Sequence, residues 1–260
     1  MTALSLINRV SLRAALWLVL GVQVLIAGAL VWNDFDRMRF LPGTDREVAP
    51  RITDPAAPGD QTRPYRPGTV PAREGRPGGP IALPQQMDAM TFSFQETQEY
   101  GRVMLLSGTI TPGTSDRFER ELDGTPAPDT VALHSPGGSV RDALRIARIV
   151  RESGWNTLLS QDAACASACP LIQFAGVERF VSRTAWVGMH QAAFVDGGFL
   201  TSAQAAREIQ TLQGEILQHV VDMGVDPAVQ THALSTPPEQ VYYLLEEEIE
   251  RYGVATEFID

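Results

Sequence analysis

The chain contains no lysine, and all 21 of its basic residues are arginine. This absence excludes a serine–lysine dyad, a lysine Schiff base and a phosphate-binding loop that ends in lysine. A serine enzyme built on this sequence has to use histidine as its base. Four histidines are present, and no two of them have the spacing of a zinc-protease helix: His134, His190, His219 and His232.

Cysteine is almost as scarce, since Cys165 and Cys169 are the only two in 260 residues. Two cysteines are too few for a disulfide scaffold, or for a structural zinc site with its usual four ligands. We therefore expect neither a metal nor another cofactor in this protein.

Positive charge is also scarce in the larger part of the chain. Residues 1–90 carry a net charge of +2 and residues 91–260 a net charge of −12, which together give −10. Nucleic-acid binding requires a basic surface that neutralises phosphates, so we expect no nucleic-acid partner.

One long hydrophobic run is present, an uncharged stretch of 19 residues at positions 14–32. This length suffices to span the hydrocarbon core of a bilayer as a helix. Trp17 and Trp32 lie near its ends, where aromatic residues favour the interface. Arg9 and Arg13 precede it, which predicts a cytoplasmic N-terminus (residues 1–13) and an extracytoplasmic, periplasmic remainder.

A cleaved signal peptide is the alternative for this run. Residues 27–29 read Ala-Gly-Ala and have the small-residue pattern of a cleavage site. The run is longer than a usual signal-peptide core, so we favour a single-pass anchor over a signal peptide and over a buried core helix.

Residues 33–90 are predicted to form a disordered, proline-rich linker. Positions 41–90 hold 10 of the 18 prolines and show no apolar periodicity. Such a segment cannot bury enough surface to offset its ordering entropy, so we interpret it as an extended tether.

Residues 91–260 alternate between strand-like and helix-like patterns. Strands are predicted at 102–108, 130–134, 156–160, 179–182 and 185–190, and helices at 111–124, 139–154, 167–176, 201–224 and 239–253. This order predicts an α/β fold, with helices packed on a largely parallel sheet.

Three stretches where strands meet turns or helices carry candidate chemistry: "HSPGGSV" (134–140), "CASACP" (165–170) and "VGMHQ" (187–191). The Gly137-Gly138 turn can present bare amides to a developing oxyanion. Ser167 opens a predicted helix, where a serine is most often a cap but is also well placed as a nucleophile. His190 follows a hydrophobic strand, and the missing lysine raises its value as a base.

Taken together, these stretches resemble the Clp protease proteolytic subunit and its relatives on the ClpP/crotonase fold. The resemblance runs through 130–191, continues in "EEIERYGV" (247–254), and does not include the first 90 residues. It implies a spiral of ββα units in the domain at 91–260. It also implies a serine peptidase that forms and hydrolyses an acyl-enzyme.

The resemblance assigns roles to individual residues. It implies Ser167 as nucleophile, His190 as general base, and an oxyanion hole from the amides of Gly138 and Ala168, together with Gly137. The family places an aspartate shortly before the last helix, but here the segment reads "LSTPPEQV" (234–241). Candidate replacements for that third member are Glu239 and Asp226, with Ser235 and Thr236 as weaker ones.

The spacing of Cys165 and Cys169 leaves several interpretations open. Residues four apart in a helical turn are close enough for a disulfide, which an extracytoplasmic location permits. Two buried free thiols are the main alternative, and a catalytic cysteine or a metal ligand is another.

Three functions are consistent with the sequence. The first is a membrane-anchored serine hydrolase, which we expect to be a peptidase acting on peptide or protein substrates. The second is a catalytically inactive relative that binds peptides or a partner protein. The third is crotonase-type chemistry on an acyl thioester. Homo-oligomer formation stays open.

Overall fold

The computed structural model describes residues 11–38, 57–70, 81, 83, 87–192 and 201–259. The chain divides into two compact units, Met1–Val48 and Ala49–Asp260. The first contains helix α2 (Leu12–Met38), on which Leu16, Trp17 and Leu25 are exposed. Among the described residues, no helix combines the length and apolarity that crossing a membrane requires. The anchor at 14–32 stays a prediction.

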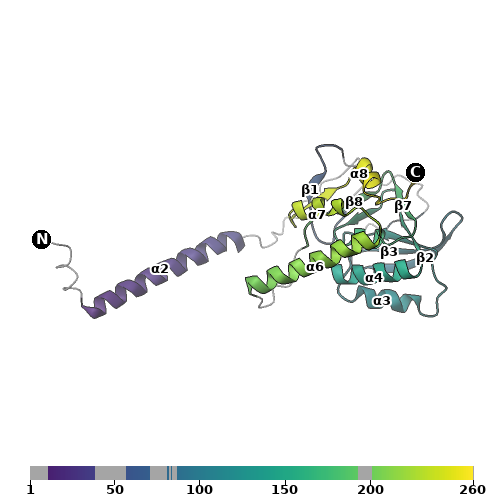
Figure 1. Cartoon of the computed structure of the whole chain (residues 1–260). Coiled ribbons are helices and arrows are strands. Elements are labelled where there is room, and N and C mark those ends of the chain that lie inside the picture. The colour runs from purple at the N-terminus through teal and green to yellow at the C-terminus, as the bar shows by residue number, and fades with distance from the viewer. Residues whose placement is uncertain are drawn as a thin grey trace. The chain divides into compact units, whose positions relative to one another are not determined.

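The second unit is built on a six-stranded sheet (Figure 1). Its strands, in spatial order, are β10 (Glu257–Ile259), β7 (Arg179–Ser182), β5 (Asn156–Leu159), β4 (Thr130–His134), β3 (Gly101–Ser107) and β2 (Thr91–Thr97). All neighbours are parallel except β2 and β3, which form an antiparallel pair. The domain is therefore mixed α/β with a largely parallel sheet, as the sequence pattern predicts.

A smaller second sheet carries the candidate site. Its order is β1 (Thr62–Pro64), β9 (Gln240–Tyr243), β8 (Trp186–Met189) and β6 (Ala164–Ala166). Strands β6 and β8 are parallel, and Ala166 pairs with Gly188. The residues that follow these two strands therefore leave the sheet at the same edge, and they include Ser167 and His190.

The helices are α3 (Thr114–Leu122), α4 (Val140–Glu152), α5 (Cys169–Gln173), α6 (Ser202–Asp222), α7 (Gln230–Ser235) and α8 (Glu246–Arg251), with a 3₁₀ turn, η1, at Pro227–Val229. Helix α4 begins directly after the Gly-Gly turn, where Ser139 caps it by accepting from the Asp142 N–H. Figure 1 shows α3 and α4 side by side. Their buried residues, with those of β3, β4 and α5, form the main core.

Two predictions fail in this part of the chain. The helix predicted at 239–253 is wrong over residues 239–245, because Gln240–Tyr243 is strand β9 and α8 starts only at Glu246. The sequence "QVYY" has strand character, and Val241 and Tyr243 are buried alternately with their neighbours.

The disordered linker predicted for 33–90 is also wrong in part, and at its start helix α2 continues to Met38. Residues 62–64 form strand β1, which pairs antiparallel with β9, and Ile81 and Met87 are buried. Proline is compatible with an edge strand, so Pro64 does not prevent this pairing. Positions 39–56 and 71–80 of the predicted linker lie outside the described residues.

Candidate active site

Ser167 lies at a sharp turn between strand β6 and helix α5. Its φ is 62°, and among the described non-glycine residues only Asp162 shares a positive φ. This left-handed conformation costs a non-glycine residue on the order of 1–2 kcal/mol. The N–H of Ser167 donates to the Gly188 carbonyl at 2.9 Å, which helps to hold the turn. Strain of this kind in a half-buried polar residue is typical of functional sites.

The Gly-Gly turn packs directly against the Ser167 turn. Gly137 has a φ of 96°, and a Cβ added there would lie 2.5 Å from the Cβ of Ser167 and 2.8 Å from the N of Ala168. Gly138 has a φ of 138°, and its added Cβ would lie 2.2 Å from the Ile110 carbonyl oxygen. Only glycine allows position 137 to approach the Ser167 turn, and position 138 to approach Ile110, so closely.

Two backbone amides at this junction are available to a ligand. The Gly137 N–H already donates to the Ser135 hydroxyl at 3.1 Å. We find no acceptor for the N–H of Gly138 or of Ala168 among the described residues. The amides of Gly138 and Ala168 are therefore the better candidates for an oxyanion hole, and Gly137 contributes close packing.

His190 follows strand β8 and is largely screened from water. Both ring nitrogens are buried and have no hydrogen-bond partner among the described residues, so no hydrogen bond joins this ring to Ser167 here. Burial lowers the pKa of His190 below its ordinary value, and the charge of Glu239 opposes that shift in part. The imidazole is therefore neutral at neutral pH and able to accept a proton.

The candidate third members do not hydrogen-bond to His190. Glu239 is exposed and acts on the imidazole only through its charge. Asp226 accepts a hydrogen bond from the Ala228 N–H at 2.8 Å and so caps η1. Ser235 is exposed, and the Thr236 hydroxyl donates to the His232 carbonyl. Among the described residues, Glu239 is thus the one predicted acid with an electrostatic link to the site.

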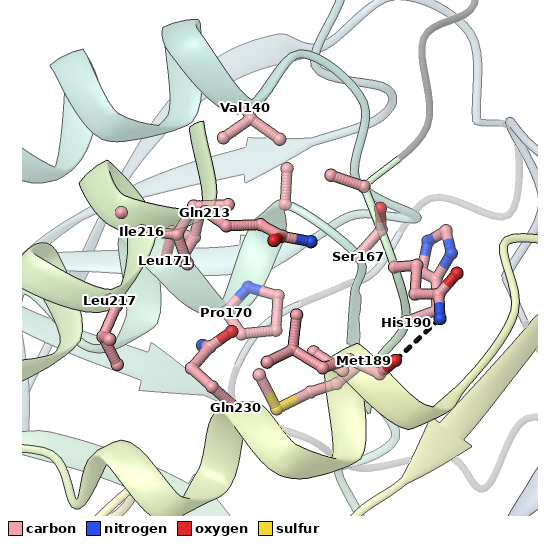
Figure 2. A pocket seen from close by; sticks show the side chains of 16 residues that line it. Val140, Ser167, Pro170, Leu171, Met189, His190, Gln213, Ile216, Leu217 and Gln230 are labelled. Carbon is pink, nitrogen blue, oxygen red and sulfur yellow. Dashed lines mark hydrogen bonds between the residues drawn. The ribbon is translucent and has the colours of Figure 1, made fainter. Parts of the chain in front are cut away.

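A cavity of about 250 Å³ opens beside Ser167 and His190. Figure 2 shows Ser167 and His190 at one end of this cavity and Leu171, Ile216 and Leu217 at the other. Its lining is mostly apolar: Val140, Ser167, Ala168, Pro170, Leu171, Met189, His190, Gln191, Ala192, Gln213, Gly214, Ile216, Leu217, Gln230, Ala233 and Leu234. A hydrogen bond of 2.6 Å from the Gln191 side chain to the Leu234 carbonyl ties its edge to α7.

Cys165 and Cys169 are joined by a disulfide with an S–S distance of 2.02 Å, and both are fully buried. The bond spans the Ser167 turn from strand β6 to helix α5. Neither sulfur is thus a free nucleophile or a metal ligand in this structure. Within the described ranges, no group of three or more histidine, cysteine or acidic side chains is arranged to hold a metal ion.

Tyr65 belongs to the site, and the sequence analysis missed it. Its ring lies 4.3 Å, centroid to centroid, from the His190 ring, and its hydroxyl donates to the Pro136 carbonyl at 2.8 Å. Burial raises the pKa of the Tyr65 phenol, and the neighbouring Ser167 side chain partly offsets this. In the structure Gln61, Arg63 and Tyr65 are half-buried and alternate with exposed residues, but the sequence itself shows no apolar alternation that indicates this.

Comparison of the sequence with protein-family models and with curated proteins finds no match.

Proposed function

We propose that this domain is a Ser-His hydrolase that cleaves peptide bonds, built on a ClpP/crotonase-type arrangement of ββα units. Ser167 is the nucleophile and His190 the general base. The amides of Gly138 and Ala168 bind the oxyanion.

The left-handed conformation of Ser167 is the observation that carries this proposal. A residue that only capped helix α5 would have no need of a positive φ. A strained turn between a strand and a helix is also where a nucleophilic serine is presented in α/β-hydrolases. The Ser167 turn also brings the Ala168 nitrogen close to Gly137, which supports placing the Gly138 and Ala168 amides next to the Ser167 hydroxyl.

The chemistry follows from these groups. The Ser167 oxygen attacks the substrate carbonyl carbon while His190 takes its proton, and the resulting oxyanion accepts hydrogen bonds from the Gly138 and Ala168 amides. The tetrahedral intermediate collapses as the protonated His190 gives its proton to the leaving amine. Water then attacks the acyl-enzyme by the same route and releases the acid.

The adjoining cavity suits the side chain on the acyl side of the cleaved bond. At about 250 Å³ it exceeds the 150 Å³ or so that holds a benzene ring in a protein interior. Leu171, Met189 and Ile216 make it apolar, so we expect cleavage after large apolar residues.

An inactive peptide-binding domain is the second candidate. It is favoured by the lack of a hydrogen-bonded carboxylate at His190 among the described residues, and by the unmade bond between His190 and Ser167. Loss of the orienting carboxylate lowers the rate of a triad by about 10⁴ but leaves measurable turnover. The two candidates therefore differ in whether that residual rate depends on Ser167.

We also propose that the domain functions outside the cytoplasm on a membrane anchor. The Cys165–Cys169 disulfide supports an oxidising compartment, and the uncharged run at 14–32 supplies the anchor. Fusing alkaline phosphatase, which is active only after export, to the C-terminus should give active reporter in membranes. An inactive fusion would contradict this placement.

Hydrolysis of a small apolar peptide ester by the full chain tests the catalytic proposal. Activity should fall to the uncatalysed rate in Ser167→Ala and by at least about 100-fold in His190→Gln. Ser93→Ala is the matched control, because this serine is exposed on strand β2 and does not line the cavity, and it should be fully active. Equal rates for Ser167→Ala and the unmodified protein would favour the inactive binding domain.

A further inference from the structure

The edge of the small sheet at strand β9 also bears on function. A segment of the same chain, residues 61–70, pairs with this edge. We infer that this edge is a docking site for an extended peptide next to the catalytic pair, and that residues 61–70 occupy it in cis. We call residues 61–70 the strap. The inference rests on the proposed function, because it assigns the place where the substrate main chain binds.

The strap pairs with β9 as an added strand would. Its residues 62–64 are antiparallel to β9, with Arg63 opposite Val241. Main-chain hydrogen bonds close both ends of the pairing: the Tyr243 N–H donates to the Gln61 carbonyl, and the Tyr65 N–H donates to the Glu239 carbonyl. Strand addition at a sheet edge is a general mode of peptide recognition, with side-chain pockets providing specificity.

Side chains from one face of the strap fix it to the domain. The Gln61 amide donates to the Tyr242 hydroxyl at 3.0 Å, and the Arg63 guanidinium lies 5.3 Å from the Trp186 ring centroid. Tyr65 and Val70 pack against the small cluster around Trp186 and Tyr243. Thr62 and Pro64 face away and are exposed.

The end of this pairing lies at the catalytic pair. Tyr65, opposite Glu239, lies against the His190 ring, neighbours the Ser167 side chain and donates to the Pro136 carbonyl of the Gly-Gly turn. An extended peptide in the same register would bring its corresponding residue to the same place. The strap therefore shows how a peptide can reach this site from β9.

The strap differs from a substrate in one respect. A phenol, and not a peptide carbonyl, meets Ser167, so there is no bond in position to be cleaved. The hydroxyl of Ser167 contacts a neutral phenol, while neither nitrogen of His190 has a partner in the described part of the chain. In this arrangement the strap and a substrate compete for the β9 edge, and the free site is available only when the strap leaves.

Labelling kinetics test the competition in the full-length protein. The probe is an alkyl fluorophosphonate that reacts with an activated serine, and the readout is the labelling rate of Ser167. We expect Tyr65→Ala to label about tenfold faster than the unmodified chain, and Tyr65→Phe to lie between them. Thr62→Ala is the control, because it changes an exposed residue of the same strand, and its rate should not change.

The outcomes separate the strap from the proposed function. If Tyr65→Ala labels Ser167 at the unmodified rate or more slowly, the strap does not compete with substrate, and the hydrolase proposal still stands. A slower rate would also indicate that Tyr65 positions the catalytic pair. If no folded variant labels Ser167, the hydrolase proposal falls, and the docking site is then judged by binding alone.

A fluorescent peptide with the sequence of residues 57–70 provides that binding test. The variant Gln61→Ala/Tyr65→Ala weakens the strap in cis, so the peptide should bind it at least about tenfold more tightly than it binds the unmodified chain. Equal fluorescence anisotropy titrations for the two proteins would overturn the assignment of the β9 edge as a peptide site.

Discussion

Adding one methyl group at Gly137 should disable the site while the domain stays folded. The φ of 96° costs an alanine on the order of 1–2 kcal/mol. The new Cβ would also lie 2.5 Å from the Ala166 carbonyl oxygen and from the Ser167 Cβ, well inside contact distance. Such overpacking costs about 1–3 kcal/mol, so the total is about 2–5 kcal/mol, within the stability of an ordinary domain.

Gly124→Ala is a control matched for backbone strain. Gly124 has a φ of 69°, and a Cβ added there would have nothing within 4 Å. Its substitution should therefore cost only the left-handed penalty of about 1–2 kcal/mol. The difference between the two variants isolates the crowding of the Ser167 turn.

Two measurements complete this test: urea unfolding for stability, and fluorophosphonate labelling of Ser167 for the site. We expect the labelling rate of Gly137→Ala to fall by about 100-fold to 1,000-fold, since a displaced Ala168 amide removes one oxyanion donor. Gly124→Ala should label at the unmodified rate. If Gly137→Ala labels as fast as Gly124→Ala, the close approach of the two turns has no role in reactivity.

Three further predictions concern the surroundings of the site. Removing the disulfide with Cys165→Ser/Cys169→Ser should lower the free energy of unfolding by about 2 kcal/mol, which is the value for so short a loop. In the unmodified chain, urea unfolding with and without reductant should show the same loss. Because burial lowers the pKa of His190, the acid limb of the pH–rate profile should have its midpoint below 6.5, and a midpoint above 6.5 would contradict this. The contribution of this histidine to stability should be lost as pH falls through 6.5 towards its folded pKa. Burial alone would raise the pKa of Asp142, but hydrogen bonds, chiefly from Ser139 and Ser115, outweigh burial and lower this pKa. Asp142→Asn should therefore lower the free energy of unfolding in urea by about 1.5–3 kcal/mol, and a loss below about 0.5 kcal/mol would show these bonds to be weak.

Local patterns in the sequence were sufficient for much of the domain. The amphipathic spacing in 139–154 predicts helix α4, and the long pattern at 201–224 predicts α6, because each helix buries a face through contacts repeated every turn. The candidate site was predictable because Gly137, Ser167 and His190 each follow a strand. In a largely parallel fold, strand ends gather at common edges.

Pairings between distant parts of the chain were not predictable in this way. Strand β1 and strand β9 are each three or four residues long and are separated by about 180 positions, so neither carries a periodicity of its own. Tyr65 acquires its place at the site only through that pairing. By contrast, Asp226 followed directly by Pro227 is a usual start of a helical turn, so its capping of η1 was within reach of the sequence.

The residue that a fluorophosphonate modifies decides whether Ser167 is the nucleophile. Full-length protein is treated with a fluorophosphonate, digested and examined by mass spectrometry, with Ser167→Ala and His190→Gln in parallel. We expect a single adduct on Ser167, which is absent from Ser167→Ala and forms far more slowly in His190→Gln. An adduct on another serine would contradict this assignment. So would the absence of an adduct on Ser167 in both the folded unmodified protein and the folded Tyr65→Ala variant.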